Sequence, residues 1–287
     1  MQPFNLPYEF VNFLIDPGLE CEAGIVKLNQ YMSKSIGNGG NDNTAALISP
    51  LRWMREGGKG ALLNKIVGGT EIDLILKGQG DPASFMMVWD FMCRNQEQLS
   101  AIKLKVVSRP PGRRNDPVVK KTGNVYDLYF RDNRDAVALQ MMVNDGFFGI
   151  DCIGFVANYL IYVGELDKYY GYDIANWDRV FTENIRTVRG VKPCQLVLWQ
   201  NYHVAIIDWV HKDKSGDIIM GNDGNSIIVD ICQSSSGGPQ CNERVILTQN
   251  SEVSHKGYRL FKIQGGTPTL PVNGHVNIMA RSGFSFE

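Results

Sequence analysis

Apolar residues recur at different spacings in the two halves of the chain. In the first half they recur every three or four residues, which is the spacing of an amphipathic helix. Residues 71–78 are an exception, because Ile72, Leu74 and Leu76 recur at every second position as in a strand. The first hundred residues are therefore expected to be mainly helical, with helices over residues 8–15, 23–32, 44–55 and 82–94. A further helix is expected over residues 132–143.

Beyond residue 186 the pattern changes to short apolar runs separated by turns. The turn sequences KDKSGD and GNDGN separate several of these runs, which is typical of an antiparallel meander. Helices followed by strands predict an α+β domain. The expected strands are TVRG, CQLVLWQ, HVAIIDWV, DIIMG, SIIVDIC and YRLFKI.

A segment rich in proline and arginine, SRPPGRRNDP, follows the mostly helical first hundred residues, and the pattern after it is mixed. Its composition predicts an exposed linker. Lysines and arginines gather around it, but no aromatic residue lies among them, so a solvated linker is favoured over a nucleic-acid surface. We expect a mainly helical region over residues 1–107, a linker over 108–117 and an α+β domain over 118–287.

Composition and charge exclude several classes of protein. The 287 residues include 29 Lys and Arg against 30 Asp and Glu, a formal net charge of −1. This balance argues against a chain that binds nucleic acid or a membrane surface as a whole. No stretch approaches the roughly 18 apolar residues of a membrane-spanning helix. The N-terminus has no basic segment before its apolar residues, so we expect no signal peptide and a chain that is cytoplasmic as made.

The cysteines give little support to a metal or redox site. They lie at positions 21, 93, 152, 194, 232 and 241 and include no C-x-x-C pair. Cys232 and Cys241 flank a Ser/Gly-rich loop and are the one pair for which a disulfide is worth testing. The glycine-rich GNGGND at 37–42 lacks the lysine and the spacing of a phosphate loop. No metal and no organic cofactor is expected.

One cysteine stands at the start of a predicted helix. In GIDCIGFVA, residues 149–157, glycine ends one element and an apolar helix begins at Cys152. The positive end of a helix dipole and the free N–H groups of its first turn favour a thiolate, and the same groups can hold an oxyanion. Cys152 is therefore a candidate nucleophile. The alternative is a buried structural cysteine.

One histidine is a suitable partner. A cysteine nucleophile needs an imidazole that acts first as general base and then as general acid. His203 opens the apolar strand HVAI, whereas His211, His255 and His275 lie in polar or turn-like segments. We predict that His203 pairs with Cys152. The alternative is a histidine at the edge of the core whose nitrogens are bonded to the backbone.

Together, DCIGFV at 151–156 and HVAI at 203–206 resemble the NlpC-type branch of the papain-like cysteine peptidases. The resemblance covers roughly residues 118–263. It implies a papain-like domain in which the N-terminal catalytic helix packs on an antiparallel sheet. It also implies a third polar residue that orients the histidine from the next strand, and by position this is Gln233, with Asp230 in reserve.

The motif departs from the family at two places that bear on the substrate. Ile153 replaces the family's serine, and Pro193-Cys194-Gln195 stands where the family has a Pro-Gly-Asp turn. Cysteine before histidine counts against the circularly permuted lecithin retinol acyltransferase-like relatives. Transglutaminase-like enzymes share the order Cys, His, Asp, and Asp230 keeps that alternative open.

The resemblance implies a peptidase or amidase that cleaves an amide bond in the stem peptides of peptidoglycan. Such an enzyme without a leader would be an antibacterial effector exported by a specialised secretion system, with an immunity or secretion partner. Two alternatives stay open. One is a leaderless papain-like toxin that acts on a host protein as a protease, deamidase or acyltransferase. The other is a non-catalytic papain-like binding module.

Overall fold

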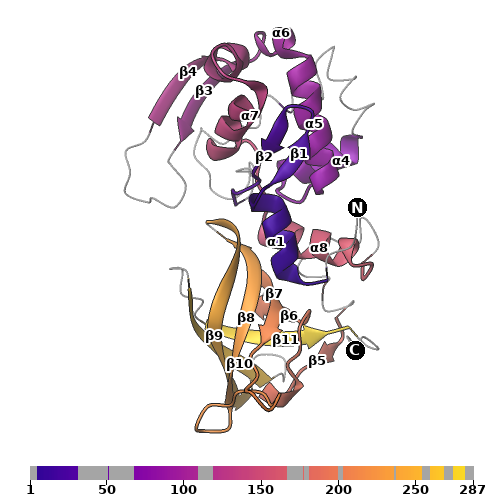
Figure 1. The fold of residues 1–287 in the computed structure, drawn as a ribbon, viewed down its shortest axis with the longest axis vertical. Coiled ribbons are helices and arrows are strands. Elements are labelled where there is room, and N and C mark those ends of the chain that lie inside the picture. Colours follow the sequence, from indigo (N-terminus) through magenta and orange to yellow (C-terminus); the bar gives the residue numbers. More distant parts are fainter. Residues whose placement is uncertain are drawn as a thin grey trace. The chain divides into compact units, whose positions relative to one another are not determined.

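The computed structural model (Figure 1) describes residues 5–31, 51, 68–108, 119–166, 177, 181–199, 203–235, 237–253, 259–267 and 274–281. Most of the helix expected over 44–55 and of the linker expected over 108–117 lies outside these residues. The contacts divide the chain into two units. We call residues 1–11, 156–233 and 240–287 the barrel unit, and residues 12–155 and 234–239 the helix–hairpin unit.

The barrel unit is built around one antiparallel sheet that closes on itself. Its strands follow the order β10-β9-β8-β7-β6-β11-β5, and β10 also pairs with β11, so that six strands form a barrel and β5 extends it at β11. The strands are β5 (Glu183–Asn184), β6 (Leu196–Trp199), β7 (His203–Val210), β8 (Ser226–Ser235), β9 (Gly238–Val253), β10 (Arg259–Thr267) and β11 (Gly274–Ala280).

Alternating apolar side chains fill the barrel. Successive side chains of a strand point to opposite faces, so every second residue of a barrel strand faces inward. Ala205 and Ile207 of β7 follow this spacing, as do Val229 and Ile231 of β8. All four are fully buried in one hydrophobic cluster. The predicted antiparallel meander is thus confirmed for β6, β7, β8 and β10, whereas strand β9 and the closure into a barrel through β11 are additional findings.

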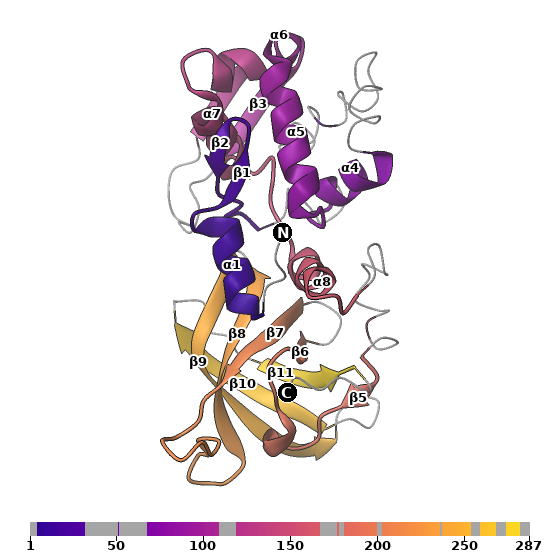
Figure 2. The ribbon, with the colours of Figure 1, turned by 45° about the vertical axis from the view of Figure 1, so that its right-hand side comes forward.

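The helix–hairpin unit combines helices with two β-hairpins. Within it α5 lies beside α4 and the first hairpin (Figure 2). Its elements are β1 (Leu19–Cys21), β2 (Gly24–Val26), α4 (Gly69–Leu76), α5 (Pro82–Arg94), α6 (Gln96–Leu99), β3 (Lys103–Ser108), β4 (Val119–Asn124), the π-helical turn Tyr126–Phe130 and α7 (Asp135–Asn144). Two further helices, α1 (Pro7–Ile15) and α8 (Cys152–Tyr162), pass from one unit to the other, between residues 11 and 12 and between residues 155 and 156.

The prediction of an α+β protein is confirmed, and so are the helices expected over 8–15, 82–94 and 132–143. The strand expected over residues 71–78 is wrong. This segment is helix α4, which buries Ile72, Ile75 and Leu76 at helical spacing. The helix expected over 23–32 is also wrong, because Gly24 has a φ of 120° and begins the second strand of a hairpin.

Two of the short strands expected in the second half are likewise wrong. Residues 188–190 form a 3-10 turn. Residues 217–221 contribute only isolated bridges at Ile218 and Met220. Both segments carry too few consecutive apolar residues to sustain a ladder in the sheet. Among the described residues, no helix is long and apolar enough to cross a membrane.

The structure divides the chain at different places from the expected 1–107, 108–117 and 118–287. Strand β3 pairs with β4 from Lys103 opposite Asn124 to Ser108 opposite Val119, so both ends of the expected linker belong to one unit. A segment rich in proline and arginine is compatible with a connection between paired strands as well as with a domain linker. As a result, Cys152 shares its unit with residues 12–107.

Candidate functional site

Cys152 is the first residue of helix α8, as predicted. The preceding residue, Asp151, caps the helix through its Oδ1 atom, which accepts the N–H of Gly154 at 2.5 Å. Its backbone N–H donates to the carbonyl of Gly78 at 2.6 Å. Cys152 is 4% exposed and is not part of a disulfide. An acidic cap and a close backbone bond therefore fix the start of the helix at the candidate nucleophile.

The carboxyl group of Asp151 is itself buried. The Nε2 group of Gln79 donates to its second oxygen at 3.3 Å. Burial nevertheless outweighs the hydrogen bonds and raises the pKa of Asp151 to about 7. The residue beside Cys152 is thus an acid that titrates near neutral pH.

Gly154 allows the first turn of α8 to lie directly against residues 78 and 79. A Cβ atom at this position would lie 2.7 Å from the Cα of Gln79 and still closer to the carbonyl oxygen of Gly78. Both neighbours are backbone atoms, which cannot rotate away as a side chain can. The glycine of the DCIGFV motif is therefore required by this packing.

Tyr31 is a site residue that the sequence analysis missed. Its hydroxyl group lies near the Cys152 side chain. Its backbone forms a parallel bridge with Ile150, whose N–H donates to the carbonyl of Gln30 at 3.0 Å. Burial, with Cys152 and Asp151 nearby, raises the pKa of Tyr31, so its hydroxyl stays protonated and available as a donor. No local pattern around residue 31 links it to Cys152, because the contact joins distant parts of the sequence.

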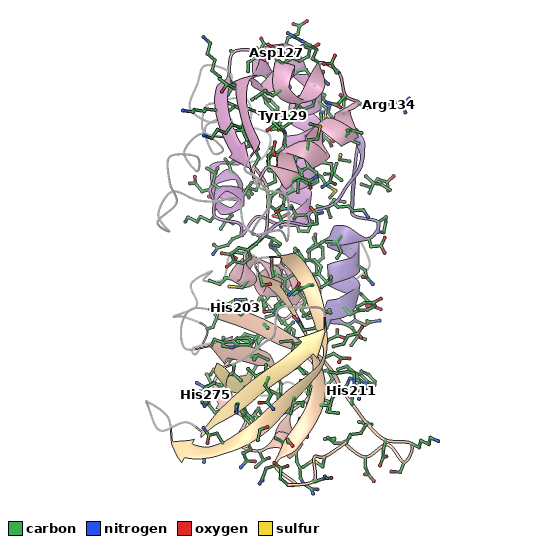
Figure 3. The ribbon with its side chains drawn as sticks, turned by 90° about the vertical axis from the view of Figure 1, so that its left-hand side faces the viewer. Asp127, Tyr129, Arg134, His203, His211 and His275 are labelled. Atoms are coloured by element: carbon green, nitrogen blue, oxygen red, sulfur yellow. A yellow bond between two sulfur atoms is a disulfide. The ribbon has the colours of Figure 1, made fainter. Side chains whose placement is uncertain are left out.

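His203 begins strand β7, as predicted, and is labelled with His211 in Figure 3. Its Nε2 atom is hydrogen-bonded to Oε1 of Gln233 on β8. The ring of Trp199 on β6 lies 5.0 Å from the imidazole, centroid to centroid. Burial lowers the pKa of His203, although the bond to Gln233 acts in the opposite direction. The ring is therefore neutral at pH 7 and can accept a proton.

Gln233 is held by a second amide. Its Nε2 group donates to Oδ1 of Asn242 on β9 at 2.6 Å, and both side chains are buried. The residues just before them, Cys232 and Cys241, form a disulfide, so the pair singled out in the sequence is linked. The disulfide and the amide pair together tie β8 to β9 beside His203.

Asp230, the reserve third residue, is engaged with a different histidine. Its Oδ1 atom lies 2.8 Å from Nε2 of His211 and also accepts the backbone N–H of Arg244 at 2.7 Å. The strand pairing explains this, since Asp230 stands opposite Trp209, far along β7 from His203. The transglutaminase-like alternative rested on Asp230 as the third residue and loses that support.

The turn before β6 contains Pro193, Cys194 and Gln195 and is closed by backbone geometry and side-chain hydrogen bonds. Cys194 has a φ of 64°, in the left-handed region that glycine enters without strain. The amide of Gln195 accepts the N–H of Lys192 at 2.9 Å and donates to the carbonyl of Gly190 at 3.1 Å. In this turn Cys194 thus adopts the left-handed backbone conformation, and the side chain of Gln195 closes the turn.

The structure brings His203 and Gln233 together within the barrel unit, and it places Cys152 with Tyr31 and Asp151 in the helix–hairpin unit. The chain crosses between the units directly after Gln233. The next residue, Ser234, belongs to the helix–hairpin unit and donates its hydroxyl to the carbonyl of Ile150 at 2.6 Å.

Among the described residues, no group of three or more His, Cys, Asp or Glu side chains is arranged to hold a metal ion. Comparison of the chain with protein-family models found no match. Comparisons with curated proteins and with solved structures found none either.

Proposed function

We propose that the protein is a cysteine hydrolase of the peptidase or amidase type, with Cys152 as nucleophile and His203 as general base and acid. The observation that carries the proposal is the hydrogen bond between His203 and Gln233. His203 is predicted from its place at the start of an apolar strand, and the family resemblance implies Gln233 as the residue that orients it. A buried amide that accepts the imidazole N–H is the role of the third residue in such sites.

The proposed reaction has two stages. In the first, His203 takes the proton of the Cys152 thiol as the sulfur attacks the amide carbonyl carbon, and the imidazolium then protonates the leaving amine, which leaves a thioester on Cys152. In the second, His203 takes a proton from water as its oxygen attacks the thioester carbonyl. The carboxylic acid product leaves, and the proton returns to the Cys152 sulfur.

We assign the oxyanion site to the backbone N–H of Cys152 and the hydroxyl of Tyr31. The Gly154 N–H is used by the Asp151 cap, so the next donor must come from elsewhere. The Tyr31 hydroxyl lies near the Cys152 side chain and stays protonated, because burial raises its pKa. One donor of this kind contributes roughly 10²–10³ in rate.

Local details support the papain-like part of the proposal. Gly154 and the left-handed Cys194 stand where the family motif has glycine, and both positions require a small or left-handed residue in this structure. Within the barrel unit, Tyr159 of α8 contacts Cys194 before β6 through its hydroxyl, 3.2 Å from the sulfur. This contact fits a catalytic helix whose later turns pack on the antiparallel strands.

The family resemblance directs the choice of substrate to the stem peptides of peptidoglycan. The test is incubation of the full chain with synthetic stem peptides, followed by mass spectrometry. Wild type should yield hydrolysed peptides, whereas Cys152→Ser and His203→Ala should yield none while melting at the wild-type temperature. Gln233→Ala should retain reduced activity, because it removes the orienting bond and leaves the catalytic pair.

The same preparation separates the alternatives. If no stem peptide is cleaved but Cys152 reacts with iodoacetamide faster than an ordinary thiol, the hydrolase proposal stands and the stem-peptide substrate is wrong, which favours a host-protein target. If Cys152 also reacts no faster than an ordinary thiol, and His203→Ala leaves its rate unchanged, the catalytic proposal is wrong. A binding module with a buried Cys152 is then the better account.

A further inference from the structure

The bond between His203 and Gln233 depends on which way the Gln233 amide faces. A glutamine amide can offer either its oxygen or its NH₂ group to an imidazole. In the structure the oxygen, Oε1, faces Nε2 of His203. The opposite orientation would require the ring nitrogen to accept rather than donate. Whatever holds the amide therefore determines which ring nitrogen carries the proton.

Asn242 supplies this constraint. Its Oδ1 atom accepts the Nε2–H of Gln233 at 2.6 Å, and Nε2 of Gln240 lies 3.5 Å from the same oxygen. Two donors thus converge on one acceptor, which fixes the Asn242 amide. Gln233 cannot flip without burying its own oxygen against that of Asn242, because both side chains are shielded from water.

Stability alone does not explain an asparagine at position 242. Its Nδ2 group is buried and has no hydrogen-bond partner among the described residues. A buried donor without a partner opposes folding, and an apolar residue of similar size would avoid this cost. The feature that asparagine provides and leucine cannot is the acceptor that faces Gln233.

With Oε1 of Gln233 as acceptor, the neutral imidazole carries its proton on Nε2, and Nδ1 keeps a lone pair. We propose that Asn242 is a positioning residue, which acts through Gln233 to hold His203 in the Nε2–H tautomer and makes Nδ1 the nitrogen that receives the Cys152 proton. The proton transfer rests on the proposed function, whereas the tautomer does not.

The test is ¹⁵N NMR of the full chain with labelled histidine, at a pH where His203 is neutral. Wild type should show His203 as the Nε2–H tautomer. Asn242→Leu should convert it to a mixture of tautomers, and Asn242→Asp, which keeps the acceptor, should restore the Nε2–H form. The control is Asn277→Leu, which removes another partly buried amide of the barrel and should leave His203 unchanged.

A second readout is the rate at which iodoacetamide alkylates Cys152. Asn242→Leu should lower this rate about tenfold, as expected for loss of a residue that orients a reacting group, and Asn242→Asp should recover most of it. If Asn242 had a purely structural role, both variants would show an equally low alkylation rate of Cys152, or His203 would keep the wild-type tautomer in both. Either result overturns the proposal.

The two readouts also separate this inference from the proposed function. An Nδ1–H tautomer of His203 in wild type overturns the role of Asn242 even if the enzyme cleaves peptides. This measurement does not depend on whether any variant folds. Conversely, one outcome is that the expected tautomers are found while Cys152 reacts like an ordinary thiol. This result supports the control of the His203 ring by Asn242 and overturns the proposed hydrolase function.

Discussion

Substitution of Gly154 by alanine tests how the start of α8 is positioned. The added Cβ would lie 2.7 Å from the Cα of Gln79, and closer to the carbonyl oxygen of Gly78, so the helix and this segment must separate. Overpacking of this kind costs about 1–3 kcal/mol, and here backbone must move, which favours the upper end. Alanine recovers about 1 kcal/mol through its greater helix propensity. We expect a net loss of roughly 2 kcal/mol in the free energy of unfolding.

The assay is urea unfolding of Gly154→Ala beside Gly190→Ala. A Cβ at Gly190 would meet only side-chain atoms, the nearest being Cγ2 of Ile185 at 3.2 Å, so this control should lose far less. Separation of α8 from residues 78 and 79 also breaks the bond between Asp151 and Gly78, so Gly154→Ala should slow the alkylation of Cys152. Equal unfolding free energies for wild type and Gly154→Ala would refute the packing argument.

Three further predictions follow from individual contacts. Tyr31→Phe should lower peptide turnover roughly 10²–10³-fold but change the alkylation rate of Cys152 much less, because alkylation forms no oxyanion; equal losses in both assays would remove Tyr31 from the oxyanion site. Replacing Cys232 and Cys241 by alanine should lower the free energy of unfolding by about 2–4 kcal/mol in urea, and an unchanged midpoint would contradict this. Burial raises the pKa of Asp208 from 3.8 to about 6, so the folded state holds its proton more tightly than the unfolded state and stability falls as pH rises through this window. Asp208→Asn should flatten the fall in stability between about pH 4 and 6, measured by unfolding at several pH values, and an unchanged slope would exclude this group as its source.

Local patterns predicted the elements that carry their own signals. Helix α5 begins at Pro82 because Asp81 caps it, accepting the N–H of Ser84 at 3.0 Å, and proline suits the first turn. Strand β7 was predicted with its observed bounds because its apolar run starts at His203 and is followed by a turn. Gln233 carries no local signal of this kind and was expected only because the family resemblance implies an orienting residue on the next strand.

The errors and omissions come from contacts between distant segments. Ile72, Leu74 and Leu76 have the spacing of a strand, whereas Ile72, Ile75 and Leu76 share one face of a helix, and packing beside α5 decides for the helix. The barrel closes through β11, a short strand that the apolar pattern did not reveal. Tyr31 meets Cys152 only because a bridge joins it to Ile150, which no local spacing indicates.

The most direct test of the central claim is the rate of Cys152 alkylation by iodoacetamide as a function of pH, followed by digestion and mass spectrometry of the peptides that carry Cys152 and Cys194. The account predicts that wild type reacts at a substantial rate near pH 7, well below the usual range of a cysteine pKa, and that His203→Ala shifts the profile to that of an ordinary thiol. Cys194 serves as the internal reference, since burial raises its pKa to about 11. A wild-type profile that coincides with that of an ordinary thiol and does not change in His203→Ala would contradict the account.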